Sequence, residues 1–241
     1  CSGIDLMSLS VIGWDIGGAH LKAALLDGAN QSLQVVQVPC PLWQGIAKLD
    51  LAFVEVMKQL PPSVVYRHAV TMTGELVDGF DSRQQGVAAI IASVLRQFPK
   101  GDCWIYAGSA GFMAPDGIGD AQVMQIASAN WWASASLAAS FEVDALFVDI
   151  GSTTTDILLI EGHQLRNLGY TDYERLISSE LVYTGVVRSA VMAVAQTAHF
   201  NGHEMGLMTE YFATMADVYR VTGELDEAHD QHATADGAEK S

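Results

Sequence analysis

Basic residues are scarce in this chain. Its 241 residues include 12 Lys and Arg against 28 Asp and Glu, which gives a formal net charge of −16. Nucleic acids and anionic membranes are bound through clusters of lysine and arginine that neutralise phosphates, and the sequence contains no such cluster. We therefore expect neither kind of partner. An anionic small molecule would need backbone amides or a local cation instead, which favours a site that includes Mg²⁺.

Cysteine and long apolar runs are scarce as well. Cys1, Cys40 and Cys103 are odd in number and lack the spacing of a metal site, a pattern typical of reduced thiols in the cytoplasm. No apolar stretch approaches the roughly 20 residues of a membrane span, and we expect no signal peptide before the first strand. The chain starts with Cys instead of Met, and we assign no function to residues 1–9. A cytoplasmic location is expected.

A short pattern occurs twice. Residues 11–27 read VIGWDIGGAHLKAALLD and residues 146–162 read LFVDIGSTTTDILLIEG, so that Asp15 aligns with Asp149. Each copy has an apolar run, an Asp-x-Gly with small or hydroxyl residues, and a second apolar run, which predicts two strands joined by a tight turn. Such a turn exposes backbone N–H groups, and an aspartate at a strand end can hold a cation. The simplest chemical use of the pair is to hold a phosphate or diphosphate between the two turns.

The spacing of the two copies predicts two lobes. Asp15 and Asp149 are 149 − 15 = 134 positions apart, and 50% of the residues are hydrophobic, enough for a core. We expect a first lobe at 10–144 and a second at 145–241, incomplete and helical after residue 170. Strand and helix patterns alternate, which indicates an α/β fold with mixed sheets. Strands are expected at 11–16, 21–26, 34–38, 68–73, 103–107, 145–150 and 156–160, and helices at 46–60, 87–98, 121–141, 173–177, 182–196 and 208–221.

The first turn carries residues suited to an anion. Gly17 and Gly18 permit close approach of an anion to the backbone, Lys22 can add positive charge, and Asp15 points into the turn. A plain hairpin whose glycines only make the bend is equally consistent with the sequence. His20 is more simply a turn or core residue than a catalyst.

The second turn is the more specific of the two. Four consecutive hydroxyl residues, Ser152 to Thr155, supply amide and hydroxyl donors for phosphate oxygens, with Gly151 before them. Asp149 and Asp156 can orient metal-bound water or hold the turn. The structural alternative is a solvated turn rich in serine and threonine.

A loop after the expected strand at 68–73 is a third candidate. Thr73, Gly74 and Glu75 lie at the strand end, where ligand loops occur in α/β sheets, so that Glu75 or Asp78 can act as a base or a metal ligand. The alternative is the start of a helix, with Thr73 as its cap and Glu75 in its first turn. The sequence supports both readings equally.

Two C-terminal segments complete the candidates. Residues 183–185 interrupt a helical stretch and can begin a helix whose N-terminus faces an anion, with Arg188 one turn later. A helix–helix corner with Arg188 on the surface is the alternative. Thr214, Asp217 and Arg220 share one helical face, which either lines a cleft or carries an intrahelical Asp–Arg pair.

Five separated blocks resemble a known family. They read DIGGAHLKAAL, MTGEL, VDIGSTTTDI, SELVYTGVVR and EYFATMADVYRVTGEL. Together they look like the hydantoinase/oxoprolinase-like group labelled tetrahydromethanopterin-linked C1 transfer pathway protein, over residues 11 to about 237. The paired turns also resemble the phosphate motifs of the actin, sugar-kinase and heat-shock ATPase superfamily, which implies two ribonuclease-H-like lobes. The superfamily's adenosine motif has no counterpart after Ile160, so that either the chain is truncated or nucleotide is not needed, and the resemblance leaves ATP binding open.

The resemblance also implies an activity. The group that the motifs resemble is similar to the enzyme that builds the ether bond of methanofuran or methylofuran. That enzyme is a transferase that moves an (aminomethyl)furan-methyl group from its diphosphate to the phenol of γ-glutamyl-tyramine. The implied partners are small-molecule diphosphate and phenolic substrates, and the oligomeric state is left open. Two alternatives from other classes are an ATP-dependent kinase or lactam hydrolase, and a non-catalytic scaffold.

Roles within this reaction follow by position. Mg²⁺ near Asp15 and Asp149 would neutralise the departing diphosphate, and Glu75 or Asp156 would take the phenol proton. The expected phosphate-binding residues are Gly17, Gly18, Lys22, Gly151, Ser152, Thr153 and Thr154. The expected substrate-binding residues are Thr73, Gly74, Tyr183, Thr184 and Arg188.

Overall fold

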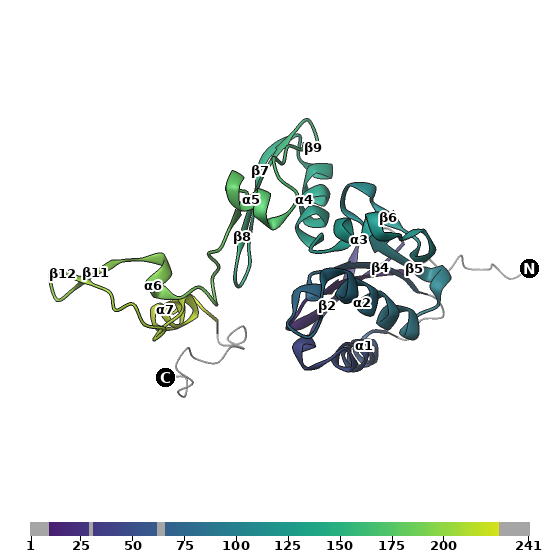
Figure 1. Cartoon of the computed structure of the whole chain (residues 1–241), viewed down its shortest axis with the longest axis horizontal. Coiled ribbons are helices and arrows are strands. Elements are labelled where there is room, and N and C mark those ends of the chain that lie inside the picture. The colour runs from purple at the N-terminus through teal and green to yellow at the C-terminus, as the bar shows by residue number, and fades with distance from the viewer. Residues whose placement is uncertain (1–9, 29–30, 62–65, 227–241) are drawn as a thin grey trace, which may run out of the picture. The chain divides into compact units, whose positions relative to one another are not determined.

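The computed structural model describes residues 10–28, 31–61 and 66–226 (Figure 1). The expectations for Cys1, for residues 1–9 and for the polar segment after residue 226 lie outside these ranges. The chain divides between Ser134 and Ala135 into two compact units. The expected lobe boundary at residues 144 and 145 stays a prediction.

The first unit is built on a six-stranded sheet with the strand order β3-β2-β1-β4-β5-β6. The first three strands form an antiparallel meander, and β4 and β5 run parallel to β1. The strands are β1 Ser10–Ile16, β2 His20–Leu26, β3 Ser32–Pro39, β4 Tyr66–Met72, β5 Cys103–Tyr106 and β6 Phe112–Met113. The order 3-2-1-4-5 with an antiparallel second strand is that of a ribonuclease-H-like lobe. The expected α/β fold class with mixed sheets is therefore confirmed.

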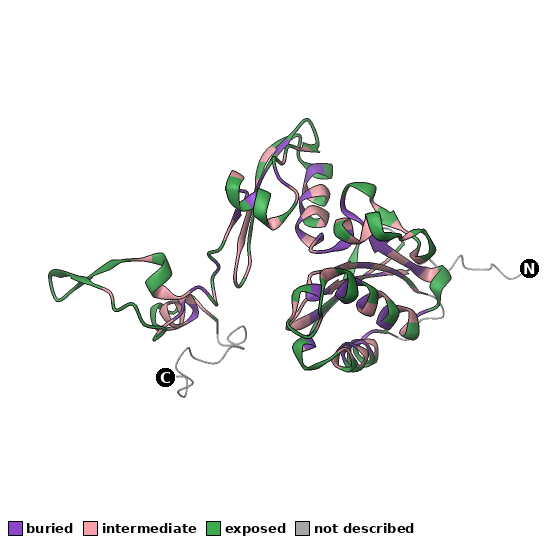
Figure 2. Ribbon diagram, in the orientation of Figure 1, coloured by how far each residue is buried: buried purple, intermediate pink, exposed green. Residues whose placement is uncertain are grey.

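Helices α1 (Ala47–Gln59) and α2 (Arg83–Gln97) share the core of one sheet face. Alternate residues of β1 are buried on this face, because successive side chains of a strand point to opposite sides. Trp14 is at its centre and meets the ring of Phe53 edge to face, with ring centroids 5.0 Å apart. Figure 2 marks the buried stretches of these strands and helices in purple. Asp15, one residue further along β1, consequently lies on the opposite face.

The single helix expected at 121–141 is wrong: two helices, α3 (Asp120–Ile126) and α4 (Asn130–Phe141), take its place. Between them Ser128 adopts a left-handed backbone conformation with φ of 53°. Its hydroxyl donates to the buried carboxylate of Glu75 at 2.7 Å. A tertiary hydrogen bond thus interrupts a stretch that its own helix propensity would continue.

The second unit contains the second hairpin and smaller elements after it. Strands β7 and β8 pair antiparallel over seven residues, with β10 on the far edge of β8 and β9 paired to its end. The elements are β7 Asp144–Ile150, β8 Thr155–Glu161, β9 Gln164–Leu165, α5 Asp172–Ser178, β10 Leu181–Val182, α6 Val191–Val194, β11 Thr197–Phe200, β12 His203–Gly206 and α7 Met215–Thr222. The expected hairpin and the helix at 173–177 are confirmed.

The helix expected at 182–196 is wrong. The structure has the short strand β10, an irregular segment and the four-residue α6 there. The amide of Val186 donates to the Gly151 carbonyl at 3.0 Å, and the amide of Arg188 donates to the Ser152 carbonyl at 2.7 Å. Because these amides bind the second turn, they cannot form a helix ladder.

The helix expected at 208–221 is shorter than predicted, and a hairpin precedes it. Thr214 is the N-cap of α7, which therefore starts at Met215. Strands β11 and β12 pair around Asn201 and Gly202, which have φ of 50° and 78°. Asn-Gly is the strongest short signal for such a turn, and the sequence contained it. Among the described residues, no helix combines the length and apolarity needed to cross a bilayer.

Candidate functional site

The first turn packs against the loop that follows β4. The Thr73 amide donates to the Ile16 carbonyl at 2.9 Å. A Cβ atom added at Gly74 would come 3.1 Å from the Gly17 carbonyl oxygen, and one added at Gly18 would come 2.7 Å from Val77. The structure therefore brings together the first turn and the loop after β4, which were predicted from the sequence as separate candidates.

One amide and two carbonyl groups of the first turn are already bonded. The Gly17 amide donates to the His20 carbonyl at 3.0 Å, while the Gly18 and Ala19 carbonyls accept from Leu42 and Cys40 at 3.0 and 2.7 Å. Protein atoms also pack closely against Gly18. Phosphate binding by this turn stays a prediction.

Asp15 and Lys22 form an ion pair across the first hairpin. They face each other in the β1–β2 register, and Lys22 Nζ lies 3.1 Å from Asp15 Oδ2. The aspartate side chain is 27% exposed and the lysine 54%. The second aspartate oxygen, Oδ1, is buried and has no hydrogen-bond partner among the described residues. Asp15, which was expected to hold a cation, and Lys22, which was expected to bind phosphate, therefore neutralise each other.

Glu75 is a buried acid. Its side chain is 1% exposed, and Oε1 accepts from the Ser128 hydroxyl at 2.7 Å. Burial raises the pKa of Glu75, and the hydrogen bond from Ser128 counteracts part of that rise. Thr73 is the N-cap residue of the short 3₁₀ helix Gly74–Leu76 and Glu75 lies in its first turn, as the helix-start alternative placed them, but the Thr73 side chain makes no capping hydrogen bond. Glu75 holds the break between α3 and α4, while Asp78 is exposed.

A later segment packs against the second turn and braces it. The Gly151 amide closes the turn onto the Thr154 carbonyl at 2.8 Å. The Thr155 hydroxyl donates to the Thr184 carbonyl at 2.6 Å. A Cβ atom added at Gly185 would lie 2.5 Å from the Thr153 amide nitrogen. In the described part of the chain the Ser152 and Thr153 amides form no backbone bond, whereas their hydroxyls share a hydrogen bond of 3.5 Å. The two amides remain available to a ligand.

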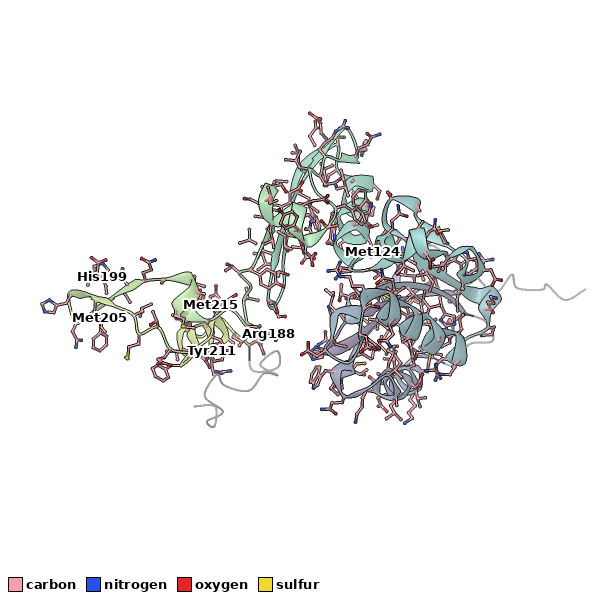
Figure 3. The ribbon with its side chains drawn as sticks, viewed as in Figure 1. Met124, Arg188, His199, Met205, Tyr211 and Met215 are labelled. Atoms are coloured by element: carbon pink, nitrogen blue, oxygen red, sulfur yellow. The ribbon has the colours of Figure 1, made fainter. Side chains whose placement is uncertain are left out.

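Arg188 is exposed in the segment beside the second turn, where Figure 3 labels it. Its amide binds the Ser152 carbonyl, which ties the residue to the turn through the backbone. No helix begins at residues 183–185, so the predicted helix N-terminus is wrong. Tyr183 is 66% exposed. The contact of this segment with the second turn was not predicted from the sequence.

Asp156 is held by a buried arginine that the motifs did not reveal. Arg175 of α5 is 1% exposed, and one of its terminal nitrogens donates to Asp156 Oδ1 at 2.5 Å and to the Glu180 carbonyl at 3.3 Å. Burial raises the pKa of Asp156, and the guanidinium of Arg175 counteracts part of that rise. The carboxylate holds α5 against β8, which does not favour a role as base. In the sequence only the Thr171 and Glu174 capping box marked this region, and a capping box indicates a helix start.

On one face of α7, Asp217 forms hydrogen bonds with both Thr214 and Arg220. Asp217 Oδ2 accepts from the amide and the hydroxyl of Thr214 at 2.7 and 2.9 Å. Arg220 donates to Asp217 Oδ1 at 2.7 Å. The intrahelical pair, one of the two alternatives, is what the structure shows.

The donors for a metal are few. Within residues 10–28, 31–61 and 66–226, no three His, Cys, Asp or Glu side chains come together as a metal-binding group. Asp15 does not fit as a direct ligand, because one oxygen is paired with Lys22 and the other is buried. Asp149 is an exposed carboxylate at the end of β7. One carboxylate together with substrate phosphates is a common way to bind Mg²⁺, so Asp149 fits such an ion.

The comparisons with known proteins give the family. Residues 67–241, more than half of the chain, match the model of the hydantoinase/oxoprolinase family. The chain belongs to the hydantoinase/oxoprolinase family. This family member is 31% identical over 236 residues to a protein of Methanocaldococcus jannaschii named (4-{4-[2-(gamma-L-glutamylamino)ethyl]phenoxymethyl}furan-2-yl)methanamine synthase, a match that covers 97% of this chain and 68% of that protein.

Another relative carries the same name. The synthase of Methanococcus vannielii is 32% identical to this hydantoinase/oxoprolinase family member over 99 residues, which are 41% of this chain and 44% of that protein. The chain therefore spans 68% of the length of one curated relative, and the match to the other covers less than half of that relative.

Solved structures show weaker likeness to this family member. An ethanolamine utilization protein EutJ from Carboxydothermus hydrogenoformans has a TM-score of 0.37 at 16% identity and covers 66% of this chain and 50% of that one. A ROK family glucokinase from Streptomyces griseus has a TM-score of 0.38 at 14% identity and covers 67% and 47%. The fold assignment rests on the strand topology, because these scores are too low to add to it.

Proposed function

We propose that this family member forms an aryl ether, joining a phenol to a furan-methyl group as a step of methanofuran or methylofuran synthesis. The observation that carries the proposal is the match of 97% of the chain to the Methanocaldococcus jannaschii synthase. That protein's name describes a product in which a phenoxymethyl group links a phenyl ring to a furan. A transferase is consistent with this bond.

The proposed reaction is a displacement at the furan-methyl carbon. The phenol oxygen forms a bond to this carbon while the bond from the carbon to the diphosphate oxygen breaks. The furan ring can stabilise positive charge at the methylene carbon as the leaving group departs. Stabilising negative charge on the departing diphosphate should therefore lower the barrier most.

The second turn is the best-supported place for the diphosphate. Its Ser152 and Thr153 amides and hydroxyls are donors without backbone partners, and exposed Arg188 belongs to the segment that braces them. We extend the proposal to Gly151 and Thr154 in the same turn. Asp149 would hold Mg²⁺ together with diphosphate oxygens, and the bound ion would supply positive charge for the leaving group. We also propose that Gly17, Gly18 and Lys22 of the first turn bind phosphate.

The phenol proton needs an acceptor. Glu75 and Asp156 stay proposals for this role, although each is occupied, by Ser128 and by Arg175 respectively. We also propose that the partners are small molecules and that the protein works in the cytoplasm without nucleic acid or membrane, because the net charge of −16 repels polyanions.

The test is diphosphate release from the furan-methyl diphosphate in the presence of the phenol, with and without Mg²⁺. Asp149→Asn should reduce the rate at least about 10-fold with an unchanged melting temperature, since the charge of one carboxylate in a metal site is lost. Asp120→Asn, at the exposed start of α3, makes the same change in charge and should leave the rate unaltered. Equal rates for the two variants would remove the proposed role of Asp149.

Adding ATP separates the alternatives. The proposed transferase releases diphosphate without nucleotide, whereas a kinase or a lactam hydrolase of the kind that the family description indicates would need ATP. A chain with no turnover in either condition, but with a stable protein partner, would support the scaffold instead.

A further inference from the structure

Residues 185–190, the segment that braces the second turn, are hydrogen-bonded on two sides. On one side the Arg188 amide donates to the Ser152 carbonyl at 2.7 Å. On the other side the Ser189 carbonyl accepts from the Met215 amide at 2.8 Å, where α7 begins. The segment therefore connects the hydroxyl-rich turn to α7 through backbone groups, and the bonds hold it in one place.

Ser189 is a buried polar residue of this segment, 9% exposed. Its Oγ accepts a hydrogen bond from the amide of Gly185 at 2.7 Å, and the bond is buried. Among the described residues, no backbone carbonyl accepts from that amide. The Ser189 hydroxyl therefore closes the loop from Gly185 to Ser189 and satisfies a buried donor, which would otherwise carry a desolvation cost.

Arg188 lies within the loop that this hydroxyl closes, and its side chain is exposed. In the part of the chain that the structure describes, its guanidinium belongs to no ion pair. The chain has 28 acidic and 12 basic residues, so an arginine without an acidic partner is a notable exception. Such a cation beside the two free amides of the turn suits an anion with several oxygens.

We propose that Ser189 is a positioning residue for the diphosphate site. Its hydroxyl keeps the loop closed, and the closed loop fixes the backbone of Arg188 relative to the free amides of Ser152 and Thr153. This role rests on the proposed function, in which the second turn binds the diphosphate. A hydroxyl that served stability alone would leave the affinity of the folded protein for an anion unchanged.

Binding of inorganic diphosphate to the full chain, measured by calorimetry in the presence of Mg²⁺, tests the role. Ser189→Ala should weaken binding at least about 10-fold, because the loop loses the bond that preorganises the site. Ser189→Thr keeps the hydroxyl and should restore the affinity of the unchanged protein. Ser189→Cys is the second variant should Ser189→Ala unfold. A thiol is a weaker hydrogen-bond acceptor, so it should weaken binding several-fold.

A matched control separates positioning from stability. The Ser178 hydroxyl of α5 donates to Glu180 Oε2 at 2.7 Å, and this bond lies outside the second turn and the segment that braces it. Ser178→Ala should lower the melting temperature, since a partly buried hydrogen bond is lost. Its affinity for diphosphate should equal that of the unchanged protein.

A double-mutant cycle tests whether Ser189 acts through Arg188. Arg188→Gln removes the positive charge and should weaken diphosphate binding. In that background Ser189→Ala should cost no more than about threefold, because residues that act together are not additive. A loss of about 10-fold from Ser189→Ala in both backgrounds would overturn the proposed action through Arg188.

The outcomes separate Ser189 from the proposed function. Undiminished diphosphate affinity in folded Ser189→Ala or Ser189→Cys, or a loss that folded Ser189→Thr does not restore, would overturn the positioning role, including when the ether is formed. Absence of diphosphate binding to the unchanged chain would overturn both. Binding that weakens in Ser189→Ala and recovers in Ser189→Thr supports the role even when no ether is formed, and in that case the proposed reaction alone fails.

Discussion

Gly185 lies directly against Thr153, so that a Cβ atom at position 185 would come 2.5 Å from the Thr153 amide nitrogen and 2.6 Å from the Gly151 carbonyl oxygen. The hydroxyl-rich turn is therefore shaped by a residue far along the chain. Its donors are held in place before a ligand arrives, which is how a preorganised anion site gains strength.

This contact predicts the effect of Gly185→Ala. The added methyl group must displace backbone atoms of the turn, since no flexible side chain is there to move aside. We expect a drop in diphosphate release of at least about 10-fold, with a loss of about 1–3 kcal/mol in the free energy of unfolding. Gly206→Ala is the control, because nothing lies within 4 Å of its added Cβ. Turnover at the unchanged rate in Gly185→Ala would mean that the turn does not contact the substrate.

The buried pair of Arg175 and Asp156 predicts a large effect on stability. Arg175→Met removes the cation beside the Asp156 carboxylate, whose side chain is only 17% exposed. The free energy of unfolding should fall by about 3–5 kcal/mol in urea titrations. Adding Asp156→Asn should recover part of that loss. Arg166→Met breaks the exposed pair with Glu161 at 3.1 Å and should change stability by less than about 1 kcal/mol. Similar losses for Arg175→Met and Arg166→Met would contradict the role of burial.

His68 predicts a pH dependence of folding. Burial lowers the pKa of His68 to about 4, and its Nδ1 accepts a hydrogen bond from Trp14 Nε1 at 3.1 Å, which requires the neutral ring. The unfolded chain binds this proton near pH 6.5, so stability from this residue is present above that pH. It is lost as the pH falls from 6.5 towards 4, by on the order of 3 kcal/mol.

Thermal unfolding at pH 7.5 and at pH 4.5 measures this effect. In His68→Gln, which has no titrating ring, the difference between the two pH values should shrink. A difference as large in His68→Gln as in the unchanged protein would assign the acid sensitivity to other groups.

Glu75→Gln separates catalysis from structure at one position. Burial raises the pKa of Glu75 in the folded state. The stability that this acid contributes is therefore lost as the pH rises above the pKa of the unfolded chain, and its ionisation opposes folding at neutral pH. Gln keeps an acceptor for the Ser128 hydroxyl, so the variant should be as stable as the unchanged protein at pH 7, or more so. Turnover near the unchanged rate would exclude Glu75 as the base, and a loss of about 100-fold without destabilisation would support it.

Local patterns in the sequence were enough to predict several elements. Alternating apolar residues predicted both hairpins, since a strand buries every second side chain. Apolar spacing predicted α1, and the polar residues of the second turn marked it as a ligand candidate. The Asn201-Gly202 turn could have been predicted from the same kind of signal, but was not.

The errors share one physical cause. A break at Ser128 depends on the Glu75 carboxylate, and the irregular segment at 183–190 depends on the carbonyls of Gly151 and Ser152. Local propensity cannot reveal such contacts, because each partner lies many positions away. Arg175 was missed for the same reason, since only the fold places it against Asp156.

By itself, the sequence determined the acidic character of this protein, its two aspartate-led hairpins, its α/β class and, through its ordered motifs, its family. The tertiary structure decided which of the candidate residues have atoms left for a ligand. It paired Asp15 with Lys22, buried Glu75 and left Ser152 and Thr153 with unused donors. The difference is physical: periodicity and composition act between neighbours along the chain, whereas hydrogen-bond partners and burial are settled by residues that folding brings together.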